Sequence, residues 1–147
     1  MSNIIESTYA GSVETITELN GSKLLVDDTH GIVIVEWTGV VGLITASTLL
    51  GAGADMIERH NCTKILLDRR NLAEFDGEAR AWIKEELLPR RAKKLVGLVM
   101  KVAFVNSEMT KGRVFGNLIS IAIRFAFPKL QLEKFDSIIE ARNWISE

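Results

Sequence analysis

The sequence predicts an α/β fold: a single domain built on a mixed β-sheet that is antiparallel at first, mostly parallel later, and covered by about four helices. Three observations predict it. Short β-branched segments separated by turn signals fill the first third of the chain, which is typical of an antiparallel meander. From residue 38 on, apolar strands alternate with helical periodicity, which is typical of right-handed parallel crossovers. The segment 64–68 has a continuous apolar centre, as expected for a strand covered on both faces.

Composition bounds the possible functions. The chain has 147 residues, of which 47% are hydrophobic, and a formal net charge of -1. This length suits one domain, and the apolar content is sufficient for a full core. The near-zero charge provides no field that would attract nucleic acid or an anionic membrane surface. We see no signal peptide or membrane-spanning segment, and the lone Cys62 cannot form an internal disulfide, so we expect a cytoplasmic location.

The N-terminal meander is expected to contain three strands. They cover residues 13–19, 23–27 and 32–37. Asn20-Gly21 and residues 28–31 separate them, and both segments contain residues that tolerate positive φ. The alternative, loops around a single strand, fits these two turn signals less well. A loop with Gly39 and Gly42 is expected to follow the third strand.

A helix is predicted over residues 45–60, with Thr45 as its N-cap. Gly51 and Gly53 lie inside it, and each costs roughly 1 kcal/mol relative to alanine. They therefore indicate close approach of the helix to the sheet or to another chain. They do not form a dinucleotide-binding fingerprint, because no strand precedes them and no third glycine follows at the required spacing.

The buried strand at 64–68 ends in a polar segment that we expect to form a loop. Ligands and partners gather at the carboxyl ends of strands in open α/β sheets, so residues 68–78 are the first place to look for a functional site. Asp68 is expected to order this loop, paired with one of the two arginines that follow it. Asp76 is expected to cap the next helix.

The remaining elements complete an order of β-β-β-α-β-α-β-α-β-α. They are a helix over 77–88, a basic helical segment over 90–97, a strand over 100–105, a helix over 111–127, a strand over 129–135 and a helix over 138–145. Glu78 lies in the first turn of its helix, where the helix dipole favours a carboxylate. Pro89 is expected to break or kink the same helix. Asp136 or Ser137 is expected to cap the last one.

The predicted helix 111–127 is more apolar than a helix that only covers a sheet. Its four polar residues are spaced four, three and four apart, so they form one narrow stripe. Covering a sheet requires an apolar face of roughly 100°. Contact with another chain, the wall of a pocket, and ordinary core packing explain the excess equally well. The candidate contact residues on this helix are Arg113, Phe115, Ile119, Ile123 and Phe127.

Several stretches together carry a resemblance to a known family. They are the strand 32–37, the strand 64–68 with its exit Asp-Arg-Arg-Asn, Trp82-Ile83 with Pro89, the strand 102–105, and the segment 135–145. They resemble the SpoIIAA-like, STAS-type family, which is related in fold to the CRAL-TRIO lipid-transfer domains. The resemblance covers the chain from about Leu24 on. Many such proteins are small bacterial domains with no assigned activity.

The resemblance implies a site at the start of the helix after the central strand. In anti-sigma-factor antagonists of the STAS type, a serine just after an aspartate accepts a phosphate there. Asp76 matches the aspartate, whereas Gly77 stands at the position of the serine, so this chain departs from the family at the phosphorylated residue. Glu78 adds negative charge nearby, either as a stand-in for phosphoserine or, more commonly, as a partner of the helix dipole.

No catalytic, metal or cofactor motif stands out. His60 and Cys62 are two residues apart and lack a second pair of ligands. No Gly-x-Ser-x-Gly elbow is present. Asp68 and Asp76 could form a carboxylate pair for acid/base chemistry, but the ordering and capping roles explain both. The basic run 90–94 lacks interleaved aromatic residues, which favours a solvated helix face over nucleic-acid binding.

Two functions from different classes follow as hypotheses. The first is a non-enzymatic interaction module, acting as a homodimer or binding another protein. Its candidate contact surface comprises Asp68, Arg69, Asp76, Glu78 and the five residues of the helix 111–127 named above. The second is a carrier or sensor of a lipid or another small apolar ligand. Neither requires a cofactor, nucleic-acid binding or insertion into a membrane.

Overall fold

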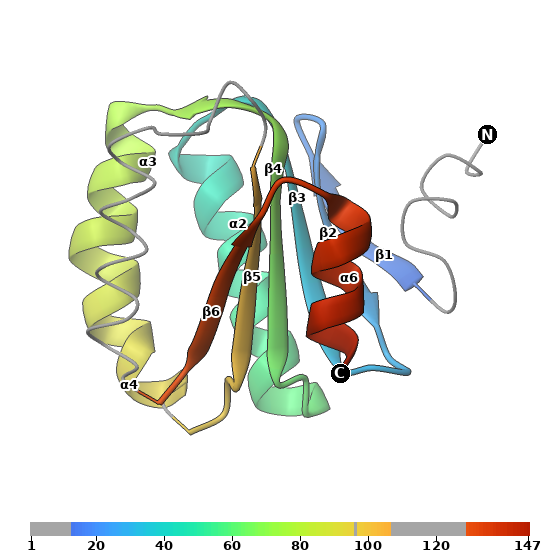
Figure 1. Cartoon of the computed structure of the whole chain (residues 1–147). Helices are drawn as coiled ribbons and strands as arrows, with labels where there is room; N and C mark the ends of the chain where they lie inside the picture. The colour runs from blue at the N-terminus through green and yellow to red at the C-terminus, as the bar shows by residue number, and fades with distance from the viewer. Residues whose placement is uncertain (1–12, 96, 107–128) are drawn as a thin grey trace.

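The computed structural model describes residues 13–95, 97–106 and 129–147, apart from the side chains of residues 92 and 93 (Figure 1). Within these ranges, six strands form one sheet in the order β1-β2-β3-β4-β5-β6. The strands are β1 Val13–Leu19, β2 Ser22–Asp27, β3 Ile32–Val41, β4 Lys64–Phe75, β5 Lys101–Asn106 and β6 Gln131–Phe135. The pairs β1–β2 and β2–β3 are antiparallel, and the three later pairs are parallel. The predicted fold class is confirmed.

Helices cover both faces of the sheet. The described helical elements are α2 Leu43–His60, the continuous run of α3 Gly77–Trp82, the π-helix Ile83–Arg91 and α4 Ala92–Leu95, and α6 Ile138–Ser146. Figure 1 shows α2 and α6 on opposite faces of the sheet. Successive side chains of a strand point to opposite faces. Thus Leu24 packs in the layer of α2, whereas Leu25 packs in the layer of α6. Two apolar layers result, one on each side of the sheet.

The central strand is longer than the sequence indicated. β4 continues through the segment that was expected to form a loop, because Asp68 and Asn71 pair with β3. β3 likewise continues to Val41, and its register shifts twice on the way. Gly39, with φ of 71°, lies beside one of these shifts, where a residue without Cβ adopts positive φ at little cost. The prediction of loops at 38–44 and 68–71 was therefore wrong for most of both segments.

The position of β4 agrees with the prediction of a covered central strand. Leu66 is fully buried in the layer of α6. Ile65 and Leu67 are partly buried and pack against the layer of α2. β5 ends at Asn106, opposite Arg69, and β4 continues to Phe75 while it remains paired with β3.

Two predicted helix boundaries require correction, and for a third the structure decides between the two predicted cap residues. α2 begins at Leu43 with Gly42 as its N-cap, so Thr45 lies within the first turn, where its Oγ1 accepts a hydrogen bond of 2.9 Å from Asn20 Nδ2. Pro89 does not break its helix: the helical run continues through it as a π-helix. Ser137, and not Asp136, caps α6, and its Oγ accepts a hydrogen bond of 3.3 Å from the Glu140 amide. The predicted helix 111–127 lies outside the described residues.

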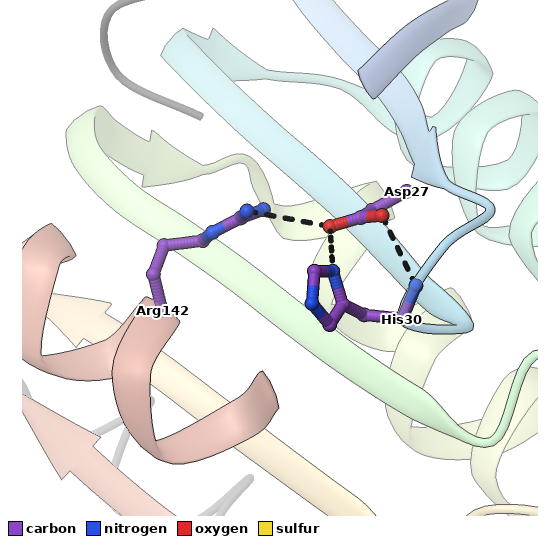
Figure 2. A network of polar contacts seen from close by, with 3 residues as sticks. All are labelled: Asp27, His30 and Arg142. Atoms are coloured by element: carbon purple, nitrogen blue, oxygen red, sulfur yellow. Dashed lines mark hydrogen bonds and ion pairs between the residues drawn. The ribbon is translucent and has the colours of Figure 1, made fainter. Parts of the chain in front are cut away.

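A polar network centred on a buried aspartate attaches α6 to the turn between β2 and β3 (Figure 2). Asp27 at the end of β2 is only 1% exposed. Its Oδ2 lies 3.3 Å from Arg142 Nη2 of α6 and 2.9 Å from His30 Nδ1, and its Oδ1 accepts a 3.1 Å hydrogen bond from the His30 amide. A buried carboxylate is tolerated when such partners replace the water it loses. The network therefore adds a polar attachment to the apolar packing of α6 against the sheet.

Candidate functional site

The candidate site is the edge of the sheet at which α2 and α3 both begin. The amide of Asp76 donates a 2.9 Å hydrogen bond to the carbonyl of Val41, which joins the ends of β4 and β3. A Cβ at Gly42 would lie 3.2 Å from Asp76 Oδ2, so the N-cap residues of the two helices are in close contact. We call this region, with Val40, Ile44, Glu74, Asp76 and Glu78, the helix-start edge.

Asp76 has the capping role that its sequence context indicates. Its Oδ1 accepts a 2.9 Å hydrogen bond from the amide of Ala79, which satisfies one of the donors left open in the first helical turn. Glu78 lies in the same turn and is exposed. Gly77 is also exposed, and a Cβ there would meet Arg80 Nη2 at an ordinary contact distance of 3.9 Å. A side chain is thus sterically possible at this position.

Two exposed aliphatic residues lie on the helix-start edge. Val40 is 65% exposed and Ile44 is 73% exposed, and they flank Gly42 on its two sides. Glu74, which is exposed, is the register partner of Val40 on the neighbouring strand. Reasoning from sequence missed both aliphatic residues, because the segment was interpreted as a loop. The alternation of β3 continues to Val41, which is buried, and this pattern could have identified Val40 as outward-facing.

Asp68 is buried and bound by the second of the arginines that follow it. Arg70 donates from Nε to Asp68 Oδ1 at 3.0 Å and from Nη2 to Oδ2 at 2.7 Å, and the Arg70 amide adds a 3.1 Å bond. Such two-pronged contacts are among the strongest polar interactions of a carboxylate. The predicted pairing of Asp68 with a neighbouring arginine is confirmed for Arg70, although the segment is a strand.

Arg69 is also inside the fold, on the opposite face of β4 from Asp68. It is 8% exposed, and its guanidinium carbon lies 4.5 Å from the ring centroid of Phe104. Its Nη2 donates a short hydrogen bond to Asn106 Oδ1 on the paired residue of β5. Burial lowers the pKa of Arg69 to about 10, which leaves the guanidinium charged at neutral pH.

The structure thus separates the predicted contact residues into groups. Asp76 and Glu78 lie together at the helix-start edge, whereas Asp68 and Arg69 point into the two sides of the fold. The other five are Arg113, Phe115, Ile119, Ile123 and Phe127, which lie outside the described residues.

A second feature is an apolar cavity between α2, the π-helix and the sheet. Its volume is about 130 Å³, and Arg91 is the one charged residue among the described residues that line it. Gly53 on α2 contributes to the wall, and a Cβ there would lie 3.5 Å from Val33 Cγ1. The predicted close approach of α2 to the sheet is therefore confirmed at Gly53. At Gly51 no atom of the described part of the chain lies within 4 Å of the corresponding position.

The described residues contain little that supports bond-making chemistry. They include no group of three or more His, Cys, Asp or Glu side chains placed to hold a metal ion. Burial raises the pKa of the Cys62 thiol, with smaller contributions from the charges of Asp28 and Asp27, so the thiol is protonated at neutral pH. None of the described helices has the length and apolar character needed to cross a lipid bilayer.

Comparison with known proteins establishes the fold. No protein-family model matches the sequence, and no curated protein is significantly similar to it. The structure is similar to that of the unphosphorylated anti-sigma factor antagonist SpoIIAA, with a TM-score of 0.55 and 14% identity over 84% of this chain and 96% of that one. It is also similar to an uncharacterised DUF3478-family protein with a SpoIIAA-like fold from Shewanella loihica PV-4, with a TM-score of 0.52 and 14% identity over 90% and 93% of the two chains. The chain has a SpoIIAA-like fold, as its resemblance to that family implied.

Proposed function

We propose that this protein is a non-enzymatic interaction module that binds a protein partner through the helix-start edge. The observation that supports this most directly is the exposure of Val40 and Ile44 on the rigid ends of a strand and a helix. Aliphatic residues that protrude from a fixed backbone are suitable anchors for a partner, because binding immobilises little of the chain. The fold is shared with an anti-sigma factor antagonist, whose name describes an action directed at another protein.

The charges of the helix-start edge define the chemistry of the partner. Glu74 and Glu78 are exposed on the helix-start edge, and Asp76 is held there by its capping bond. The exposed Arg80, whose guanidinium reaches the Gly77 position, is outnumbered by these three carboxylates. Carboxylates at the rim of an apolar contact steer and select a partner with complementary charge. The proposed partner therefore presents apolar side chains flanked by lysine or arginine. It is either a second copy of this chain or a different protein.

Site-specific photo-crosslinking tests the proposal. A photoreactive p-benzoylphenylalanine replaces Ile44 in one version of the protein and Ile139 in a second, and each is irradiated in the cells that produce it. Ile139 is a matched control, because it is a similarly exposed isoleucine on α6, which covers the opposite face of the sheet. We expect a discrete product at Ile44 that is absent at Ile139.

The mass of the product identifies the class of partner. Twice the chain mass of 16.3 kDa indicates a homodimer, and any other discrete mass indicates a heterologous partner. Substitution of both Glu74 and Glu78 by lysine should reduce the yield at Ile44 if basic groups face them. Equal labelling at the two positions, or no product at Ile44, would contradict the proposal.

The cavity supports a second candidate function, the carriage or sensing of a small apolar ligand. Its walls come from the sheet, α2 and the π-helix, and all but one of its described lining residues are apolar. A neutral apolar probe such as 1-hexanol should bind to the protein and should bind less well after Ala54→Leu, which places extra carbon atoms at the cavity wall. Unchanged binding in that variant would show that the probe binds outside the cavity, and it would contradict the ligand-carrier function.

A further inference from the structure

We propose that the cavity holds a small monoanionic amphiphile, with its apolar part among the aliphatic side chains and its carboxylate on Arg91. This inference rests on the second candidate function and assigns it a class of ligand. It follows from the size of the cavity, the single charge among its described lining residues, the neighbour of that charge, and the form of the helix that carries it.

The size of the cavity limits the apolar part of the ligand. Its volume is about 130 Å³. An engineered apolar cavity of about 150 Å³ in another protein remains dry and binds benzene. The cavity therefore has room for one ring, or for an alkyl chain of about six carbons by the same comparison. Because the cavity is open to solvent, this limit applies to the enclosed part of the ligand.

Arg91 provides the site for the charged group. Arg91 is among the residues that line the cavity, and its side chain is partly exposed. The inference assigns its aliphatic carbons to the apolar wall and its guanidinium to the mouth of the cavity. The nearest carboxylate oxygen among the described residues is Glu58 Oε2 of α2, which lies 3.7 Å from Arg91 Nη1. This distance is too long for a hydrogen bond, and a guanidinium has five N–H donors. Arg91 can therefore donate to a ligand carboxylate while Glu58 stays in place.

Glu58 also selects among anions. The pair of Arg91 and Glu58 is formally neutral, so a monoanionic carboxylate on Arg91 adds one negative charge to it. A dianionic phosphate monoester would bring a second negative charge close to the Glu58 carboxylate, and like charges at such short range repel. The pair formed by Arg91 and Glu58 thus favours a fatty-acid-like or aromatic carboxylate over the corresponding phosphate.

The wall that carries Arg91 is unusual. Leu87, Leu88 and Arg91 all line the cavity, and all three belong to the π-helix Ile83–Arg91. Segments of π-helix are rare and are found frequently at functional sites. Opposite this wall, Gly53 and Ala54 of α2 have side chains too small to fill the space. The cavity therefore results from a rare backbone form on one side and from small residues on the other.

The test compares hexanoate, hexyl phosphate and 1-hexanol by isothermal titration calorimetry. Hydrogen bonds to a charged group contribute about twice as much as neutral ones, so we expect hexanoate to bind on the order of tenfold more tightly than 1-hexanol. Hexyl phosphate should bind more weakly than hexanoate. In Arg91→Gln the preference for hexanoate over 1-hexanol should disappear, and Ala54→Leu should weaken the binding of both ligands.

Arg90→Gln is the matched control. Arg90 is the sequence neighbour of Arg91, is exposed, and pairs with Glu86 at 3.0 Å without lining the cavity. The preference for hexanoate should be unchanged in this variant. Circular dichroism and the melting temperature show whether each variant is folded, and Ile65→Phe replaces Ala54→Leu as the cavity-filling variant if the latter does not fold.

The comparison of hexanoate with 1-hexanol separates the role of Arg91 from the binding of an apolar ligand in general. Equal affinity of the wild type for hexanoate and 1-hexanol, or a preference that persists in Arg91→Gln, would overturn the assignment of Arg91 while leaving an apolar-ligand function intact. No binding of either probe would overturn the inference and the second candidate function together. The crosslinking result at Ile44 is independent of both, so the interaction function succeeds or fails separately.

Discussion

The guanidinium of Arg142 on α6 lies 3.3 Å from the buried carboxylate of Asp27 at the end of β2. The two residues are far apart in the sequence and belong to opposite ends of the chain. His30 approaches the same carboxylate oxygen at 2.9 Å from the adjoining turn, as Figure 2 shows. This contact attaches the last helix to the antiparallel part of the sheet.

Asp27→Ala should destabilise the protein strongly. The substitution leaves Arg142 largely buried beside an apolar methyl group, and removing one partner of a buried ion pair typically costs roughly 3 kcal/mol or more. Urea denaturation followed by circular dichroism measures the loss. Glu86→Ala provides the comparison, because it breaks an exposed pair with Arg90 and should change the free energy of unfolding by no more than about 0.5 kcal/mol. Similar effects of the two substitutions would show that the Asp27 contact contributes little.

Asp76→Ala and Asp76→Asn distinguish the capping role of Asp76 from its charge. The alanine variant loses the acceptor for the Ala79 amide and should be less stable by about 1 kcal/mol. Asparagine is an equally good N-cap residue, so Asp76→Asn should lie close to the wild type. Thermal and urea unfolding measure both. A large loss in the asparagine variant would indicate that the negative charge, and not the cap, is the important property.

Alanine should have opposite effects at Gly77 and Gly39. At Gly77 the nearest described atom to a new Cβ lies 3.9 Å away, so Gly77→Ala should stabilise the protein by about 0.5 kcal/mol, since it restricts the unfolded chain. Gly39 has φ of 71°, where a side chain is strained, so Gly39→Ala should destabilise by about 1 kcal/mol or more. Equilibrium unfolding in urea measures both. If Gly77→Ala were destabilised, the space around Gly77 would be too small for a methyl group, and this prediction would be wrong.

The stability of the protein should fall at alkaline pH partly because of Cys62. Its pKa is raised in the folded state, first by burial and then by the charges of Asp28 and Asp27. A raised folded pKa stabilises the fold below the unfolded pKa of about 8.5, and this contribution is lost as the pH rises through the folded value. The wild type should therefore lose more stability than Cys62→Ala between about pH 8.5 and pH 10. Parallel pH profiles for the two proteins would contradict this account.

Local signals in the sequence were sufficient for several features. The two turns before β3 depend on residues with their own conformational preferences, and Asn20 and Gly21 do adopt positive φ. Asp76 caps its helix through an amide only three residues away. The alternation of strands and helices indicated the change from antiparallel to parallel pairing. For the turns and the helix cap, the interaction that decides the structure connects neighbours in the chain.

Other features depend on contacts between distant segments. The polar residues after Leu67 resemble a loop, yet pairing with β3 keeps them in a strand. Proline at position 89 indicates a break or a kink in a helix; the break is absent, because the run continues as a π-helix that lines the cavity. The exposure of Ile44 and the burial of Arg69 could not be inferred either, because each depends on where the neighbouring elements end.

By itself, the sequence determined the class of fold, its turns and its helix cap at Asp76, because short-range preferences and apolar periodicity govern these features. Only the tertiary structure decided the length of β4, the residues that contact Arg69 and Asp68, the helix-start edge and the cavity beside Arg91. The physical reason is that burial and pairing are properties of surfaces brought together by folding, and residues far apart in the chain supply those surfaces.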